Sequence, residues 1–306
     1  MSTVAERAAR RPASYEVGRA RRFARSPAGR TLRKVPFWLL ILVIFVYACF
    51  PFYWAIRSAF TPDSDLFVTP VKYFPTHPTL TNFREVLSTK DFQHALINST
   101  IVAGSVTLIS LLIGSLAGYA IGRFRFMGRS AVLYLMLSMT IFPQIAILGA
   151  LYTMITSFHI YNTRWALIFT YMIFTLPFTV WVLTSFMRGL PRDLEEAAYV
   201  DGATPLQVFY KVLLPLIAPG LVTTGLLAFI AAWNEYLYAL SFTETPDERT
   251  VPVAITQFVG KSGSTFQVPW GQIMAATIIV TVPLIVATLI LQRRILAGLT
   301  AGAVKG

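Results

Sequence analysis

Charged residues and cysteine are both scarce in this sequence. Only 13% of its 306 residues are charged, whereas 55% are hydrophobic. A soluble domain carries roughly 25% charged residues, so lipid must cover part of the apolar surface. The single cysteine, Cys49, excludes an internal disulfide framework and a cysteine-rich metal site.

Residues that could carry catalysis or bind a metal are also few. The three histidines, His77, His94 and His159, are scattered along the chain, and none stands at a metal-binding spacing such as H-E-x-x-H. No catalytic triad or pair of carboxylates is evident. These absences argue against a membrane-embedded enzyme and predict that the chain holds no metal.

Basic residues are concentrated at the N-terminus, and the formal net charge is +12. Ten Lys and Arg residues precede Pro36 and directly adjoin an apolar run. A nucleic-acid interface needs a folded basic face, whereas a basic tail beside a membrane span is a topology signal. We therefore expect residues 1–36 to be a cytoplasmic tail, followed by an uncleaved first span.

Apolar runs of membrane-spanning length dominate the rest of the chain. A helix needs roughly 20 apolar residues to cross a bilayer, and prolines inside such helices are tolerated. We predict an all-α, polytopic transmembrane domain over 37–306. Most Lys and Arg residues of the loops fall on the side of the N-terminal tail, which predicts that both termini are cytoplasmic. The six expected spans are 37–58, 97–122, 131–155, 165–187, 218–240 and 272–292.

A GxxxG repeat lies in the second expected span, with Gly114, Gly118 and Gly122 on one helical face. Glycines at this spacing let two helix backbones approach closely in lipid. We expect them to serve packing within the chain rather than a specific dimer.

The cytoplasmic loop 188–217 has the pattern of two short helices. Asp193 followed by Glu196 fits an N-cap with an acidic residue three positions on. Gly202 fits a left-handed helix end, and Thr204-Pro205 fits a second helix start. The loop is therefore predicted to form a compact knob. A purely structural reading stays open, in which Glu196 only caps its helix and Phe209 only anchors the knob.

The spacing within this loop resembles the EAA signature of ABC importer permeases, and the family implies an importer type I permease fold. The matching residues are Glu196, Ala197, Ala198, Gly202, Val212, Leu214 and Pro215. In that family the loop forms coupling helices that dock on the ATP-hydrolysing subunit, so ATP is used by partner subunits and this chain binds no cofactor. The resemblance implies ATPase coupling through Glu196, Ala197, Ala198, Asp201, Gly202, Phe209, Leu214 and Pro215.

Further stretches resemble the smaller permease of maltose- and trehalose-type importers. They are Asn98-Ser99, Trp233-Asn234-Glu235-Tyr236 and the tail from Gly298 to Gly306. The resemblance implies a prokaryotic inner-membrane protein whose partners are a second homologous permease, two copies of a cytoplasmic ATPase and an extracytoplasmic solute-binding protein. It also implies that the outer loop 241–271 contacts the binding protein and that the tail reaches towards the ATPase dimer.

Polar residues inside the expected spans are candidates for the translocation pathway or for a contact between permeases. A charged side chain in a span is costly and usually faces a cavity or the protein interior. Asn234, Glu235 and Tyr236 in the fifth span and Gln144 in the third meet this description. The alternative is that Asn234 and Glu235 only hydrogen-bond a neighbouring helix at the membrane interface.

The expected function is a non-catalytic permease subunit of an ATP-driven importer for trehalose, maltose or maltodextrin. The alternatives are a permease for another carbohydrate or a polyol such as glycerol phosphate, and a secondary transporter. A secondary transporter is expected to have internal repeats and intramembrane ionisable groups, and this sequence has no convincing repeat.

Overall fold

The computed structural model describes residues 27–261 and 268–303, with side chains for 34–258 and 268–292. Every regular element in these two ranges is a helix, which confirms the all-α prediction. The chain divides into two units, residues 1–56 and 57–306. Most of the predicted N-terminal tail and the last three residues of the predicted C-terminal tail lie outside the described residues.

The helices differ widely in length, from single turns to 34 residues. In chain order they are α2 (Pro27–Ala59), α3 (Asp63–Leu66), α4 (Thr81–Ser88), α5 (Lys90–Arg123), α6 (Arg129–Ile141), α7 (Gln144–Ser157), α8 (Arg164–Gly189), α9 (Asp193–Val200), α10 (Pro205–Gln207), the π-helix η2 (Val208–Leu213), α11 (Leu214–Leu216), α12 (Ala218–Trp233), α13 (Leu237–Phe242), the 3-10 helix η3 (Pro246–Glu248), α14 (Val251–Lys261) and α15 (Trp270–Ala303).

Four helices are long and apolar enough to cross a membrane, and the count rises to six if each of two bent pairs is one span. The four are Lys34–Ala59, Lys90–Arg123, Arg164–Gly189 and Trp270–Gln292, and they correspond to the first, second, fourth and sixth predicted spans. The first helix begins at Pro27, ten residues before the predicted start. Residues 27–36, the last ten of the predicted tail, are therefore helical.

The predicted third and fifth spans are broken, so the expectation of one helix for each is wrong. In the third, α6 and α7 meet at 98°. The other bend, 76° between the segment Pro205–Leu216 and α12, falls directly before the predicted start of the fifth span at residue 218. The first break falls at Phe142, whose backbone is extended before Pro143. Proline removes a backbone donor and disfavours the helical conformation of the preceding residue. The fifth helix also ends early, because α12 stops at Trp233 and α13 starts at Leu237.

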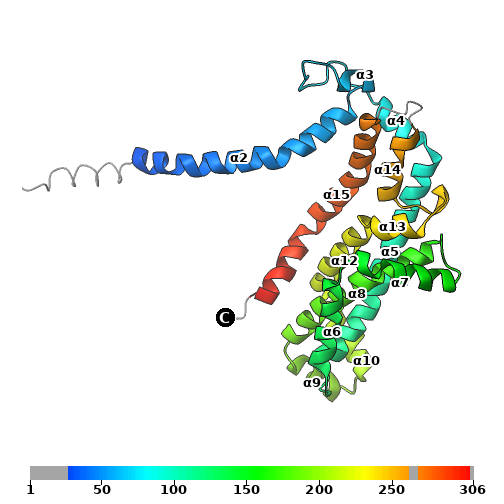
Figure 1. Ribbon diagram of the computed structural model, residues 1–306. Coiled ribbons are helices and arrows are strands. Elements are labelled where there is room, and N and C mark those ends of the chain that lie inside the picture. Colours follow the sequence, from blue (N-terminus) through cyan, green and yellow to red (C-terminus); the bar gives the residue numbers. More distant parts are fainter. Residues whose placement is uncertain (1–26, 262–267, 304–306) are drawn as a thin grey trace, which may run out of the picture. The chain divides into compact units, whose positions relative to one another are not determined.

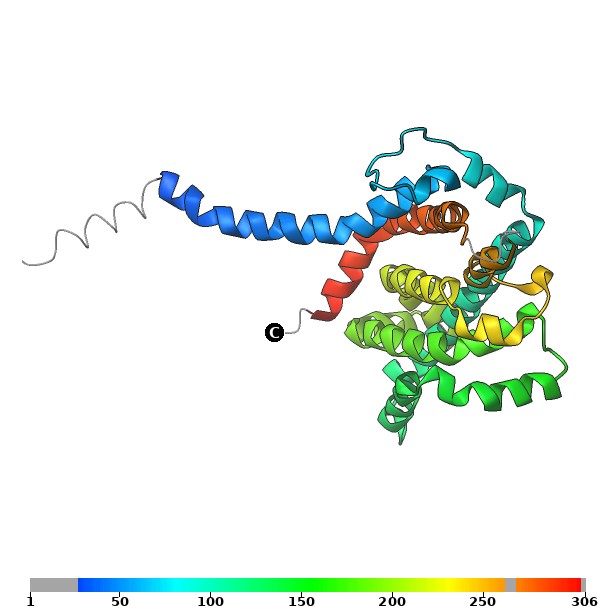
Figure 2. The same ribbon diagram turned by 45° about the horizontal axis from the view of Figure 1, so that its top comes forward.

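The bundle of residues 57–303 is organised around α5, which lies beside α8 and α12 (Figures 1 and 2). The GxxxG glycines of α5 lie against α8, and all three are buried. A Cβ on Gly118 would lie 3.0 Å from the backbone nitrogen of Thr184, and one on Gly114 would lie 2.5 Å from the Cγ2 methyl of Thr179. The prediction of packing within the chain is therefore confirmed.

Candidate functional site

α9, the first helix of the loop 188–217, starts one position away from the predicted cap. Asp193 was expected to be the N-cap, but Arg192 occupies that place and makes no capping side-chain hydrogen bond. Asp193, Glu195 and Glu196 instead all lie in the first turn. Carboxylates there interact favourably with the positive end of the helix dipole, so the acidic pattern still favours a helix start, by charge rather than by a cap.

The turn after α9 has the geometry that the sequence predicts. Gly202 has φ +81°, in the left-handed region that glycine adopts without steric cost. Its N–H donates to the carbonyl of Tyr199 at 3.0 Å, and the N–H of Ala203 donates to the carbonyl of Ala198 at 2.9 Å. These two bonds form a Schellman motif, so Gly202 ends α9 and reverses the chain.

α10 starts with a complete capping box. The N–H of Gln207 donates to Oγ1 of Thr204 at 3.4 Å, and Oε1 of Gln207 accepts from the N–H of Thr204 at 2.8 Å. Pro205 is the first helical residue, where its missing N–H has no cost. The predicted second helix start is confirmed.

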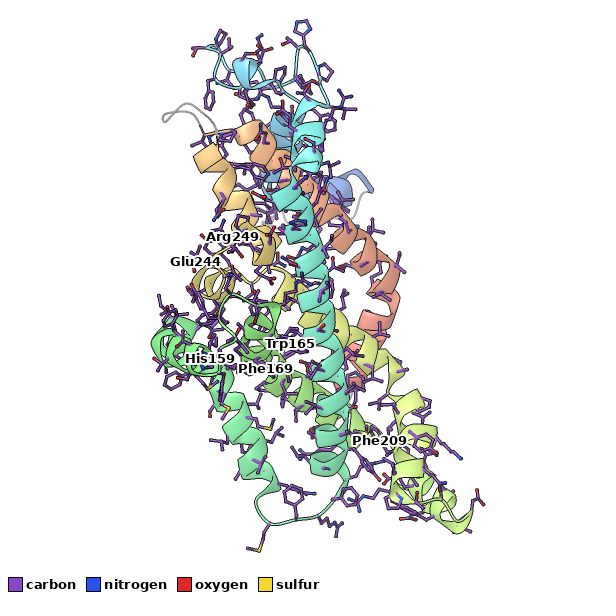
Figure 3. The ribbon with its side chains drawn as sticks, turned by 90° about the vertical axis from the view of Figure 1, so that its right-hand side faces the viewer. His159, Trp165, Phe169, Phe209, Glu244 and Arg249 are labelled. Carbon is purple, nitrogen blue, oxygen red and sulfur yellow. The ribbon has the colours of Figure 1, made fainter. Side chains whose placement is uncertain are left out.

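Phe209 points into the bundle from η2, so its side chain anchors the loop. It is 6% exposed and packs in a cluster with Leu183 and Met187 of α8. Its ring centroid lies 5.2 Å from that of Tyr119 in α5, and Figure 3 shows Phe209 beside the end of α5. The anchoring interpretation of Phe209 therefore describes its position better than a direct contact with a partner.

The outward surface of the loop is acidic and apolar. Glu196, Ala197, Asp201, Gly202 and Pro215 are exposed, whereas Ala198 and Leu214 are half-buried. Within the described part of the chain, the Glu196 carboxylate has no hydrogen bond or ion pair. A capping role for Glu196 therefore has no supporting hydrogen bond, and the carboxylate is available to a partner.

Two apolar residues of this surface do not pack as the sequence pattern suggests. Val200 and Leu206 are 87% and 63% exposed, although helices commonly turn their apolar side chains towards the core. Contiguous exposed apolar patches mark interaction sites, and these two side chains lie on the same loop as the free Glu196 carboxylate. Periodicity alone did not show which side of such a short helix would face outwards.

Arg123, the last residue of α5, was missed as a functional candidate because the sequence showed only a basic residue at the end of a span. Its guanidinium donates to the carbonyls of Leu190 at 3.0 Å and Pro191 at 3.2 Å. It also forms an ion pair with Glu195 of α9. The two side chains are 5% and 13% exposed, so the pair is almost enclosed.

The residues predicted for the translocation pathway lie at helix breaks rather than inside spans. Oε1 of Glu235 accepts from the N–H of Tyr238 at 2.8 Å, and Oε2 accepts from the N–H of Ala239 at 3.1 Å. Glu235, which is 8% exposed, therefore caps α13. This local role was not predicted, because the sequence indicated an unbroken helix at this point.

The two helix breaks are brought together by Tyr238. Its hydroxyl lies 3.5 Å from the backbone carbonyl of Gln144, the first residue of α7. The side-chain amide of Asn234 donates to the carbonyl of Ile230 at 2.8 Å. Gln144, Asn234 and Tyr236 are exposed, so these three keep their predicted role as pathway or contact candidates.

A known protein family matches most of the bundle together with the loop 188–217. Residues 110–300 match the family described as the binding-protein-dependent transport system inner membrane component. The chain belongs to this family. Its members are permease subunits of ABC transporters, which do not themselves catalyse ATP hydrolysis, and they lie in the inner membrane.

Named relatives match the permease over nearly its whole length. The trehalose/maltose transport permease MalG of Thermococcus litoralis is 41% identical over 90% of this chain and 98% of its own. The trehalose permease SugB of Mycobacterium tuberculosis is 42% identical over 90% and 99%. Among solved structures, a bacterial ABC transporter for alginate import matches with a TM-score of 0.75 at 18% identity, covering 88% of this chain and 98% of that one. The last match supports the fold alone.

The end of the permease opposite α9 is held together by Asn98 and Ser99 of α5. The Asn98 amide donates to the carbonyls of Asp247 at 2.6 Å and Arg249 at 3.0 Å. Oγ of Ser99 accepts from the N–H of Val251 at 2.8 Å. The pair therefore positions the segment 241–261, which contains the end of α13, η3 and α14. Residues 262–267 of the predicted outer loop 241–271 lie outside the described residues.

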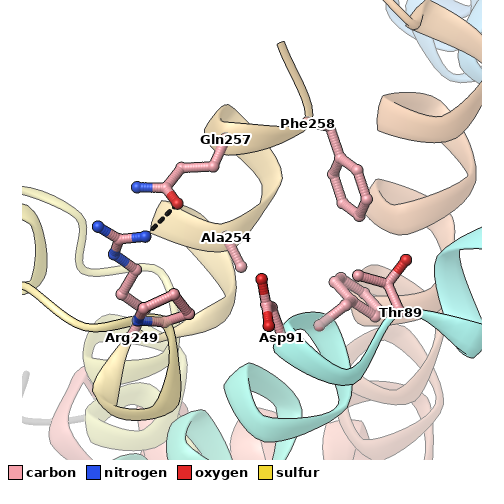
Figure 4. Close-up of a pocket in the computed structure, with 8 residues that line it drawn as sticks. Thr89, Asp91, Arg249, Ala254, Gln257 and Phe258 are labelled. Atoms are coloured by element: carbon pink, nitrogen blue, oxygen red, sulfur yellow. Dashed lines mark hydrogen bonds between the residues drawn. The ribbon is translucent and has the colours of Figure 1, made fainter. Parts of the chain in front are cut away.

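A shallow pocket lies next to this segment (Figure 4). Its lining combines a carboxylate, Asp91, with the aromatic ring of Phe258 and the guanidinium of Arg249. The guanidinium is already paired with Oε1 of Gln257. The pocket thus belongs to the surface that the sequence predicts to contact a solute-binding protein.

Proposed function

We propose that this permease forms half of the translocation pathway for a di- or oligosaccharide of the trehalose, maltose and maltodextrin class. We further propose that its loop 188–217 docks on a cytoplasmic ATPase subunit. In this reading the α9 end faces the cytoplasm together with both termini. The observation that carries it is the contrast within the loop, whose body is anchored to the bundle by Phe209 while the Glu196 carboxylate stays free at its surface.

The geometry of the loop 188–217 suits a surface on which a partner subunit pushes or pulls. A helix–turn–helix held by a Schellman motif and a capping box resists local deformation, so a partner that moves α9 also moves the helices behind it. ATP would be bound by the partner subunits and would bias the permease between inward-open and outward-open states. Such switching needs a partner that interacts differently with the two states, and the exposed loop is the surface on which it would act.

The proposed assembly contains four kinds of subunit. A second, homologous permease would complete the pathway, two ATPase copies would bind the two coupling loops, and an extracytoplasmic binding protein would deliver the solute. A solved relative of 16% identity is an alginate ABC transporter in complex with an alginate-bound periplasmic protein. The segment 241–261 with its adjoining pocket is the proposed contact for the binding protein.

The sugar class rests on the named relatives. Two of them are permeases for trehalose or for trehalose and maltose. A third, at 37% identity, is the sulfoquinovosyl glycerol permease SmoH of Agrobacterium fabrum, which keeps another carbohydrate or a polyol derivative as the second candidate. Heat unfolding of the cognate binding protein distinguishes these classes, because only a ligand that binds the folded state raises the unfolding temperature. Stabilisation by sulfoquinovosyl glycerol but not by trehalose, maltose or maltodextrin would reject the proposed class.

The docking role is tested by reversing the charge of Glu196. In the complete transporter, Glu196→Lys is expected to abolish binding-protein-stimulated ATP hydrolysis and sugar uptake while the permease still inserts. Glu196→Gln keeps the shape of the side chain and is expected to have a smaller effect. Normal uptake and hydrolysis in Glu196→Lys would show that this carboxylate has no part in coupling.

A further inference from the structure

α9 is weakly attached to the rest of the chain by packing. None of its residues is buried. It follows α8 through Gly189, which has no side chain, and through Pro191, which has no N–H. A Cβ on Gly189 would meet nothing within 4 Å, so the surroundings do not confine this connection. The link from α8 is therefore not held in place by packing at Gly189.

A polar clamp from α5 spans this weak connection. The Arg123 guanidinium holds the carbonyls on both sides of the Leu190–Pro191 bond and the Glu195 carboxylate within α9. Arginine presents several donors in a rigid planar fork, so it can hydrogen-bond the two carbonyls while its charge attracts the Glu195 carboxylate. Because both side chains are largely enclosed, water screens their interaction less than at an open surface.

The second helix of the loop is attached to the same end of α5. The Tyr119 hydroxyl donates to the carbonyl of Pro205 at 3.2 Å, and its ring packs against Phe209. Both helices of the loop therefore converge on the last turn and a half of α5. For α10 and η2 the attachment is mainly apolar, whereas α9 adds only the half-buried Ala198 to the same apolar cluster and is held to α5 by the Arg123–Glu195 pair.

We propose that Arg123 and Glu195 are positioning residues that make α9 move together with α5, so that motion of the docked ATPase enters the bundle through α5. This inference rests on the proposed docking of the loop. It assigns Glu195 a role different from that of its neighbour Glu196, since Glu195 faces inward to the clamp and Glu196 faces the partner. Without the clamp, α9 would stay joined to α10 by the Schellman turn but would lose its ion pair with α5, so less of the motion would reach α5.

The test uses the complete transporter in proteoliposomes and measures sugar taken up per ATP hydrolysed. Arg123→Gln and Glu195→Gln are expected to retain the ATPase subunits but to lower this ratio by about fivefold or more, the lower end of the range for coupling between sites. Arg123→Lys keeps the charge without the fork and is expected to restore part of the ratio. Arg125→Gln is the matched control. It removes the same charge, but Arg125 is exposed in the loop that follows α5.

A double variant separates the clamp from a general folding defect. Arg123→Gln combined with Glu195→Gln is expected to lower the ratio no further than Arg123→Gln alone, because residues of one contact are not additive. The clamp is overturned if uptake and hydrolysis fall in proportion, if the ratio is unchanged, or if Glu195→Gln releases the ATPase. Normal coupling in Glu196→Lys would instead overturn the docking proposal, so the two failures are distinguishable.

Discussion

A single methyl group at Gly118 should measure how tightly α5 packs on α8. In Gly118→Ala the new Cβ would lie 3.0 Å from the backbone nitrogen of Thr184 and 3.2 Å from the backbone carbonyl carbon of Leu183. Backbone atoms inside a helix cannot rotate away as a side chain can. Overpacking of this kind costs about 1–3 kcal/mol, so the substitution is expected to force the two helices apart or strain them.

The control for this substitution lies in the same helix. A Cβ on Gly104 of α5 would meet nothing within 4 Å, so Gly104→Ala changes helix propensity without a clash. Replacing a mid-helix glycine by alanine contributes about 0.5–1 kcal/mol of stability, and this gain is common to both variants. The difference between Gly118→Ala and Gly104→Ala should therefore report the packing cost alone, about 1–3 kcal/mol.

Thermal unfolding of the purified permease in detergent provides the assay. A change of 1 kcal/mol shifts the unfolding midpoint of a chain of this size by about 2–4 °C. Gly118→Ala is accordingly expected to unfold about 2–12 °C below Gly104→Ala. Gly118→Leu should be worse still, since a whole side chain has to enter the contact. Equal midpoints for the two alanine variants would refute the close approach of α5 and α8 at this residue.

Three further substitutions test the anchors of the bundle by the same unfolding assay. Phe209→Ala leaves a cavity against Tyr119 and is expected to cost about 3–5 kcal/mol, whereas a loss under 1 kcal/mol would show that the loop is not anchored there. Asn98→Ala leaves the carbonyls of Asp247 and Arg249 without their donor and should cost about 1–3 kcal/mol. It should also make the segment 241–261 more sensitive to proteases, and unchanged sensitivity would contradict the positioning role of Asn98. Glu235→Ala removes the cap of α13 and should cost about 0.5–2 kcal/mol, while Glu235→Gln, which keeps one acceptor, should cost less; equal losses would argue against a cap.

Local features of the loop 188–217 could be predicted because each depends on a few adjacent residues. The Gly202 turn needs only a residue that tolerates a positive φ, and the start of α10 needs only Thr204, Pro205 and Gln207 within hydrogen-bonding reach. The start of α9 was one residue off, because Arg192 is the N-cap and the acidic side chains lie in the first turn without making a capping hydrogen bond. Such short-range preferences are readable without knowledge of the rest of the chain.

The helix breaks were harder to foresee. Pro143 was visible in the sequence, but proline inside a membrane helix is tolerated when neighbouring groups satisfy the freed backbone. Whether the chain bends by a few degrees or by 98° depends on what packs beside it, here Tyr238 from a distant break. Likewise, α12 ends before Glu235, because the Glu235 carboxylate accepts hydrogen bonds from the first N–H groups of α13.

The sequence by itself determined that this chain is a helical membrane permease, because hydropathy, basic asymmetry and the EAA spacing are properties of single segments. It also indicated that Gly114, Gly118 and Gly122 serve a close helix contact. Only the tertiary structure decided that Phe209 and Glu195 face inward while Glu196 remains free, since the direction of a side chain on a two-turn helix is set by what packs against it. The role of Arg123 follows from the same cause, because its partners in the loop lie 67 to 72 residues away along the chain and meet it only in the folded bundle.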